Sequence, residues 1–152
     1  MENEKRIEGR ITTDTLRGMT AKLAVGDCDL YLKTAWFEGR IVRIDLTISR
    51  GGTGVAQEAY YLARSWVEDS CRMASKLLER GADIEEIIGM WKGVEGYPSG
   101  ACDQLQQLVK GPLHAIAVLI ENRHDTWRDS IELLTRRDAE SKIRESQEVV
   151  EG

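Results

Sequence analysis

The hydrophobic period of the chain changes across one segment, Ile48-Ser-Arg-Gly-Gly-Thr-Gly54. Before this segment, from Arg40 to Ile48, apolar and polar residues alternate, as in a strand with one face buried. After it, from Val55 to Arg80, apolar or small residues recur at helical spacing. A strand that turns through glycines into a helix brings backbone N–H groups together, which suits an anion such as phosphate. The pattern is neither a dinucleotide fingerprint nor a Walker loop, so alone it favours a plain strand-to-helix turn.

The residues before this turn predict an antiparallel meander of three or four strands between about Ile7 and Ile48. Gly26-Asp27 and Glu38-Gly39 are turn signals, and the second lies between two apolar runs as in a tight hairpin. In the last strand Val42, Ile44, Leu46 and Ile48 share one parity, opposite the polar positions. This alternation predicts a sheet that is covered on one face only.

The residues after the turn predict helices. The long helix carries two apolar rows and ends at Gly81, a favourable C′ residue. Its polar side is predicted to be a solvated face. The first row comprises Val55, Ala59, Leu62, Trp66, Met73 and Leu77; the second comprises Ala56, Ala63, Val67, Ala74 and Leu78. A short helix follows Asp83 and is ended by Gly93, and Val94–Gly100 reads as a loop.

The remainder predicts further helices. A helix capped by Asp103 is predicted to run through Leu105 to Ile120. Gly111-Pro112 either kinks it or breaks it, with Pro112 then in the first turn of a new helix. His124 to Trp127 reads as a connection into one more helix. The sequence thus predicts an α+β fold: an N-terminal antiparallel β-meander packed against a long helix, followed by shorter helices and a charged C-terminal helix. We expect a single domain at 1–135 and a charged helical or disordered tail at 136–152.

Composition limits the functional classes. The 152 residues suffice for one domain with a real core, and the net charge of −5 disfavours an extended nucleic-acid surface. No apolar run reaches the roughly 20 residues of a membrane span, and the charged N-terminus lacks the apolar region of a secretory signal. We therefore expect a cytoplasmic protein with no membrane partner.

Metal binding and catalysis have little support in the sequence. Cys28, Cys71 and Cys102 are odd in number and far apart, which is not a disulfide framework, and zinc bound by Cys28, Cys102 and His114 would need long-range assembly. If Asp103 begins a helix, the Cys102 thiol lies at its N-terminus, which favours a reactive thiolate. His114 would then lie about 16 Å further along that helix, too far to act as its base within one subunit unless the chain folds back. We expect no metal, no cofactor and no catalytic residues, and a Cys102-dependent enzyme remains an alternative.

Several short motifs and their order resemble the TSCPD domain, which occurs near the C-terminus of cobalamin-dependent ribonucleotide reductases and as small stand-alone proteins. The matching stretches are the glycine turn, Leu77–Ile88, Trp91-Lys-Gly93 and Pro98–Leu105, within about 31–121. At the name-giving motif, Cys102 and Asp103 are present, while the threonine and the proline are missing. The resemblance implies a binding or accessory module linked to nucleotide metabolism, with a ribonucleotide reductase as one partner.

A ligand site can be assembled from two predicted helix starts, after Gly54 and after Cys102, which offer free N–H groups. Arginines there suit phosphates, and an aromatic ring suits a base. The alternative for each residue taken singly is a solvated or packing role. The predicted ligand-binding residues are Arg43, Arg50, Gly51, Gly52, Thr53, Gly54, Lys92, Tyr97, Ser99, Cys102 and Asp103.

The sequence-based hypothesis is a non-enzymatic module that binds a nucleotide or another phosphate-bearing ligand and is related to ribonucleotide reductase accessory domains. It would regulate nucleotide metabolism or sequester a signalling nucleotide, as phage anti-defence proteins do. The alternative is a protein-interaction or assembly subunit without a small ligand. The large apolar helix faces predict a homo-oligomer, most simply a symmetric dimer.

Overall fold

The structure, a computed structural model, describes residues 16–50 and 57–151. A three-stranded antiparallel sheet contains β1 (Arg17–Val25), β2 (Cys28–Phe37) and β3 (Arg40–Arg50), in that order. Two helices follow, α2 (Gln57–Glu79) and α3 (Ile84–Trp91). A small hairpin of β4 (Gly100–Cys102) and β5 (Gln107–Val109) then leads into the long helix α4 (Pro112–Glu151). The predicted α+β fold with its N-terminal meander is confirmed.

The two predicted turns join the strands of the meander. Gly26 and Gly39 have φ angles of +55° and +79°, which only glycine adopts at little cost. β1 and β2 pair in register from Arg17 opposite Trp36 to Val25 opposite Cys28. A bulge at Ala35/Trp36 shifts the pairing of β2 with β3. Because of this bulge Val42 leaves the face shared by Ile44, Leu46 and Ile48 and packs with Phe37 and Leu16 in a separate small cluster.

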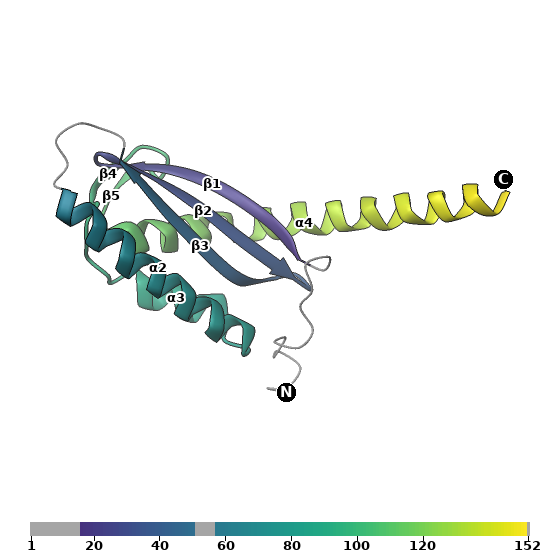
Figure 1. Cartoon of the computed structure of the whole chain (residues 1–152), viewed down its shortest axis with the longest axis horizontal. Coiled ribbons are helices and arrows are strands. Elements are labelled where there is room, and N and C mark those ends of the chain that lie inside the picture. The colour runs from purple at the N-terminus through teal and green to yellow at the C-terminus, as the bar shows by residue number, and fades with distance from the viewer. Residues whose placement is uncertain (1–15, 51–56, 152) are drawn as a thin grey trace.

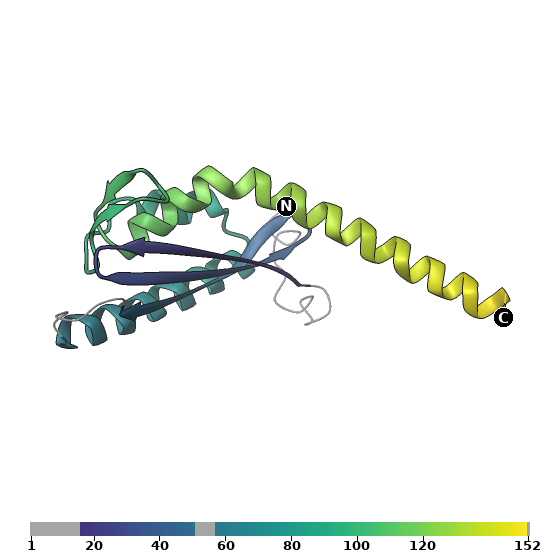
Figure 2. The ribbon, with the colours of Figure 1, turned by 90° about the horizontal axis from the view of Figure 1, so that it is seen from above.

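One face of the sheet is buried, and the other faces solvent except at the small cluster of Val42 and Phe37. The core lies between the buried face, the inner sides of α2 and α3, and the first half of α4. In Figure 1, α4 passes behind the sheet and continues well beyond it. Figure 2 shows α4 on one side of the meander, with its C-terminal half extending past the ends of the strands.

Helix α2 lies along the edge of β3 (Figure 1), and its side chains bond backbone groups of Ile44 and Ile48. The Ser75 hydroxyl accepts a hydrogen bond from the Ile44 N–H (3.0 Å) and donates to the Ile44 carbonyl (3.1 Å). The Tyr60 hydroxyl donates to the Ile48 carbonyl (2.9 Å). An uncovered edge strand is a template for unwanted pairing, and α2 removes that hazard from β3.

The second of the two predicted apolar rows on α2 is in the core, whereas the first is mostly exposed, with Trp66 partly buried against the core. Ala63, Val67, Ala74 and Leu78 of the second row are in the core, whereas Leu62, Met73 and Leu77 of the first row are exposed. The helix therefore presents a narrower buried face than predicted, because it covers a strand edge rather than a broad sheet face. The predicted solvated side is confirmed, and Arg64 pairs there with Glu68 at 3.2 Å. The predicted stop at Gly81 is also confirmed, with φ of +108° and hydrogen bonds from the Gly81 and Ala82 N–H groups to the Leu78 and Leu77 carbonyls.

The region after Gly93 differs from the prediction in two places. Residues 100–109 form the β4–β5 hairpin, where the sequence predicted the start of a helix. Helix α4 begins at Pro112, as in the predicted alternative in which Pro112 lies in the first turn of a new helix. The predicted connection at His124–Trp127 is wrong, because α4 runs through it without interruption. Trp127 and Ile131 are buried there, which holds this part of the helix to the body.

Candidate functional site

Two of the predicted basic site residues are engaged in ion pairs at separate places. Arg43 lies on the solvent face of β3, with its Nε 2.6 Å from Glu79 Oε1 at the end of α2. Lys92 follows α3, and its Nζ lies 2.6 Å from Glu121 Oε2 on α4. Arg43 is seven residues from Arg50 along the same strand, or about 23 Å at the usual rise. Arg43 therefore lies well away from the end of β3 at which the glycine turn starts.

The predicted glycine turn, Gly51, Gly52, Thr53 and Gly54, lies outside the described residues, as does the side chain of Arg50. The backbone of Arg50 pairs with Cys28, so β3 ends beside the β1–β2 turn. The Cys28 thiol donates to the Tyr97 hydroxyl at 3.5 Å, and the Ser99 carbonyl lies against Gly26. The structure thus brings Tyr97 and Ser99 to the end of the sheet where the glycine turn begins.

Cys102 and Asp103 do not mark a helix start. Cys102 is a buried residue of β4, with its Sγ 3.6 Å from Gln104 Oε1, and Asp103 is exposed in the turn that follows. Asp103 does not cap a helix. Its backbone carbonyl accepts a hydrogen bond from the Gln106 N–H (3.1 Å) within the β4–β5 turn. The predicted helix N-terminus at this position is therefore wrong, and the reason for expecting a Cys102 thiolate is removed.

The other titratable groups proposed from the sequence have structural roles. The three cysteines are free and buried, and burial raises the pKa of the Cys71 thiol to about 12. His114 Nδ1 accepts a hydrogen bond from the Lys110 N–H (2.9 Å) at the start of α4. Within residues 16–50 and 57–151, no three His, Cys, Asp or Glu side chains are grouped so as to hold a metal ion.

A different site lies at the free edge of β1. The Ala24 N–H points away from the sheet and donates to Gln104 Oε1 (3.2 Å) in the β4–β5 turn. Alternate residues of an edge strand direct their peptide groups the same way, so the N–H and C=O of Lys22 also point outward. Whereas β3 is covered by α2, β1 presents these backbone donors and acceptors to an adjacent cleft.

The cleft, which we call the edge pocket, has a volume of about 570 Å³. Its walls come from β1, the β4–β5 turn and α4, segments that lie far apart in the sequence. Helix α4 contributes Leu119, Arg123 and Trp127 at steps of four residues, which places all three on one side of the helix. The lining residues are Ala21, Lys22, Leu23, Gln104, Leu105, Gln106, Leu119, Asn122, Arg123 and Trp127.

The lining of the edge pocket contains Lys22 and Arg123 and no carboxylate, in a chain of net charge −5. Lys22 Nζ lies 3.8 Å from Asp29 Oδ2 and over the Tyr31 ring, so its charge is partly engaged on the solvent face of the sheet. Arg123 has no ion pair or hydrogen bond to any part of the chain that the structure describes. One free guanidinium therefore dominates the electrostatics of the pocket.

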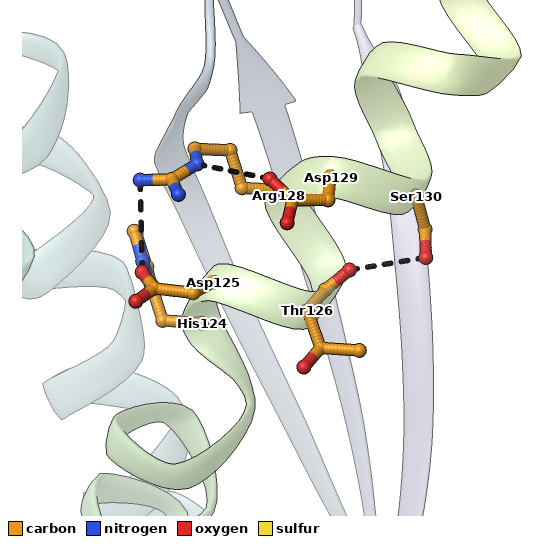
Figure 3. Close-up of polar contacts among 6 residues, drawn as sticks. All are labelled: His124, Asp125, Thr126, Arg128, Asp129 and Ser130. Atoms are coloured by element: carbon orange, nitrogen blue, oxygen red, sulfur yellow. Dashed lines mark hydrogen bonds and ion pairs between the residues drawn. The ribbon is translucent and has the colours of Figure 1, made fainter.

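The arginine five residues further along α4, Arg128, provides a contrast. Figure 3 shows Arg128 held between Asp125 (3.6 Å) and Asp129 (3.6 Å), beside the pair of His124 Nδ1 with Asp125 Oδ1 (3.0 Å). The hydrogen bond to His124 and the charge of Arg128 hold the pKa of the Asp125 carboxyl below its ordinary value. These charges satisfy one another, while Arg123 on the neighbouring turn remains available to a ligand.

Two other clefts suit an anion less well. One of about 550 Å³ lies by the Glu38-Gly39 turn, and its Arg17 and Arg136 are accompanied by Glu38 and Glu132. Arg17 is also paired with Asp138 at 2.6 Å. The second cleft, of about 250 Å³, has three carboxylates in its lining, and its Lys92 is paired with Glu121. Of these three clefts in the described part of the chain, only the edge pocket is free of acidic residues.

Comparisons with family models, curated proteins and solved structures give no match to this chain. The resemblance to the TSCPD domain therefore stays a prediction. Among the described helices, none combines the length and the apolar character needed to cross a membrane.

Proposed function

We propose that the protein is a non-enzymatic module that binds a nucleotide or another phosphate-bearing small molecule in the edge pocket. The observation that carries the proposal is a cleft of about 570 Å³ whose only charged lining residues are the cations Lys22 and Arg123. A guanidinium without an internal partner is the group that best recognises phosphate, because its donors match two phosphate oxygens at once.

The remainder of the lining supports recognition of a base. The outward peptide group of Lys22 offers one donor and one acceptor, and the side-chain amides of Gln106 and Asn122 offer both kinds. Leu105, Leu119 and Trp127 supply an apolar wall. A few convergent polar groups beside apolar side chains are typical of small-molecule sites.

A binding role, in preference to catalysis, is supported by what lines the pocket. Apart from Lys22, the lining side chains are amides, a guanidinium and apolar groups, which do not act as nucleophiles or general bases near neutral pH. The TSCPD-like motifs support a link to nucleotide metabolism by resemblance. We further propose a cytoplasmic setting in which the module accompanies a ribonucleotide reductase or sequesters a signalling nucleotide.

The test is a thermal-shift panel of mononucleotides, cyclic nucleotides and dinucleotides. A ligand that binds the folded state raises Tm by mass action, and Arg123→Ala should abolish the shift. Arg72→Ala is the matched control, because Arg72 is an exposed arginine of α2 that pairs with Asp69 outside the pocket. No shift with any ligand at about millimolar concentration would contradict the proposal. A shift that is lost in Arg50→Ala and kept in Arg123→Ala would instead assign the ligand to the predicted glycine turn.

The second candidate function is assembly, and the projecting half of α4 favours it. Side chains from Glu132 to Gln147 are all exposed on a helix that extends past the strands (Figure 2). Light scattering of the full chain and of a chain ending at Asp138 tests this candidate. If each chain has the mass of its own monomer and no partner co-purifies, this candidate loses its basis.

A further inference from the structure

Among the ion pairs of the described residues, the one furthest along α4 joins Asp138 to Arg17 at 2.6 Å. The helix nevertheless continues to Glu151, and every described side chain after Asp138 is exposed. Helical segments shorter than about 12–15 residues are marginal in water, and protein helices gain most of their stability by packing an apolar face. The projecting end of α4 is therefore a segment without a packing partner among the residues that the structure describes.

Four residues define the face available for that partner, which we call the outer face: Leu133, Arg136, Glu140 and Ile143. Their spacings of three, four and three residues place them on one side of a helix. At 100° per residue, this side lies roughly 180° from Trp127 and Ile131, which face the core. Leu133 and Ile143 are 50% and 58% exposed, so the outer face carries apolar surface with no cover in the described chain.

The outer face is complementary to itself. Leu133 and Ile143 lie five residues to either side of Asp138, and Arg136 and Glu140 lie two residues to either side. If two α4 helices cross antiparallel with a two-fold axis at the level of Asp138, each Leu133 meets Ile143 of the second copy. Each Arg136 then meets Glu140 of the second copy. An isologous dimer requires this match of one patch with itself.

We propose that the outer face pairs with the same face of a second copy of this chain, as an antiparallel α4–α4 contact. The inference rests on the second candidate function and adds the partner, the orientation and the contacts. A parallel arrangement in register would place Arg136 beside Arg136 and Glu140 beside Glu140. Like charges at such helix positions repel, so the charge pattern selects the antiparallel arrangement.

The test measures the dimer dissociation constant of the full chain by sedimentation equilibrium, with circular dichroism to check the folding of each variant. Arg136→Glu and Glu140→Arg should each weaken the dimer about tenfold or more, since each substitution turns two attractive contacts into repulsive ones. The double variant restores opposite charges at both contacts and should recover most of the affinity. Lys142→Glu is the control, because it makes the same charge change at a position away from the outer face.

Cross-linking tests the orientation separately. In an oxidised mixture of Leu133→Cys and Ile143→Cys chains, the antiparallel contact predicts a disulfide between the two different variants. A disulfide between two copies of the same variant would show parallel pairing and would overturn the proposal. So would a double charge variant that binds no better than the single ones, or a full chain that is monomeric at every concentration. If deletion of residues 139–152 dissolves an assembly that the charge variants leave intact, assembly holds and the α4–α4 contact is wrong.

Discussion

His114 shows how a single side chain makes the fold sensitive to pH. Its Nδ1 accepts the Lys110 N–H, which requires the neutral ring. Desolvation, followed by the positive charges of Lys110 and Lys92, lowers the pKa of His114 below its ordinary value of 6.5. A lowered folded-state pKa means that the unfolded chain takes up the proton first, so stability is complete above 6.5 and falls as the pH drops below it.

We therefore predict that acidification from about pH 7.5 to 5.5 lowers the free energy of unfolding of the parent chain more than that of His114→Asn. An asparagine oxygen can accept the same backbone N–H without titrating in this range. Urea unfolding of both chains at the two pH values measures the difference. An equal loss of stability in the two chains would show that other groups cause the pH dependence.

Arg123 shows why the candidate site was not predicted from the sequence. It is a single arginine between Asn122 and His124 in a stretch that read as the approach to a connection. Its significance depends on Gln104, whose side chain joins the β4–β5 turn to Ala24 across 80 residues of sequence. One local signal was present, because Leu119, Arg123 and Trp127 recur at four-residue steps. That signal acquires meaning only once α4 is known to be continuous.

At the scale of elements, the two edges of the sheet differ in how their outward backbone groups are hydrogen-bonded. At the edge of β3, α2 side chains bond the Ile44 N–H, the Ile44 carbonyl and the Ile48 carbonyl, and Ser75 alone serves both groups of Ile44. The edge of β1 is bonded by Gln104 only at Ala24, and the edge pocket lies next to it. Helix α2 thus covers the edge of β3, and β1 is the edge that lies beside the edge pocket.

From this contrast we predict that Ser75→Ala destabilises the chain by about 1–3 kcal/mol, the usual cost of leaving partly buried polar groups without partners. Ser65→Ala is the control at an exposed position of the same helix, where alanine should be neutral or slightly favourable. Denaturant unfolding of the three chains gives the comparison. A Ser75→Ala loss no larger than that of the control would mean that water satisfies Ile44 equally well.

The elements that were predicted correctly are those whose signals are local. Alternation over many residues, ended by Gly26 or Gly39, specifies a hairpin from the sequence alone. The β4–β5 hairpin was missed because its strands have three residues each, too few to distinguish period 2 from period 3.6. Asp103 also mimics a helix cap, and what settles its role is the contact of the turn with β1. The bulge that moves Val42 likewise depends on pairing with β2, which the β3 sequence does not show.

At the scale of the whole molecule, α4 performs two tasks along one helix. Its first half completes the core, down to Trp127 and Ile131, which are 9% and 5% exposed. Its second half has only exposed side chains among those described. Asp138 still pairs with Arg17 of the body, and the side chains described beyond it are all exposed.

This division predicts opposite results for two truncations. A chain ending at Asp138 keeps every buried side chain of α4, so its Tm measured at about micromolar concentration, where association is weak, should match that of the full chain within a few degrees. A chain ending at Thr126 loses two core side chains, worth about 1.5–3 kcal/mol each by burial alone. The combined loss of about 3–6 kcal/mol reaches the lower end of the usual stability of a domain, so this chain should melt far below the full chain. Circular dichroism melts distinguish the outcomes, and a large fall in Tm for the chain ending at Asp138 would show that the projecting half of α4 supports its own body.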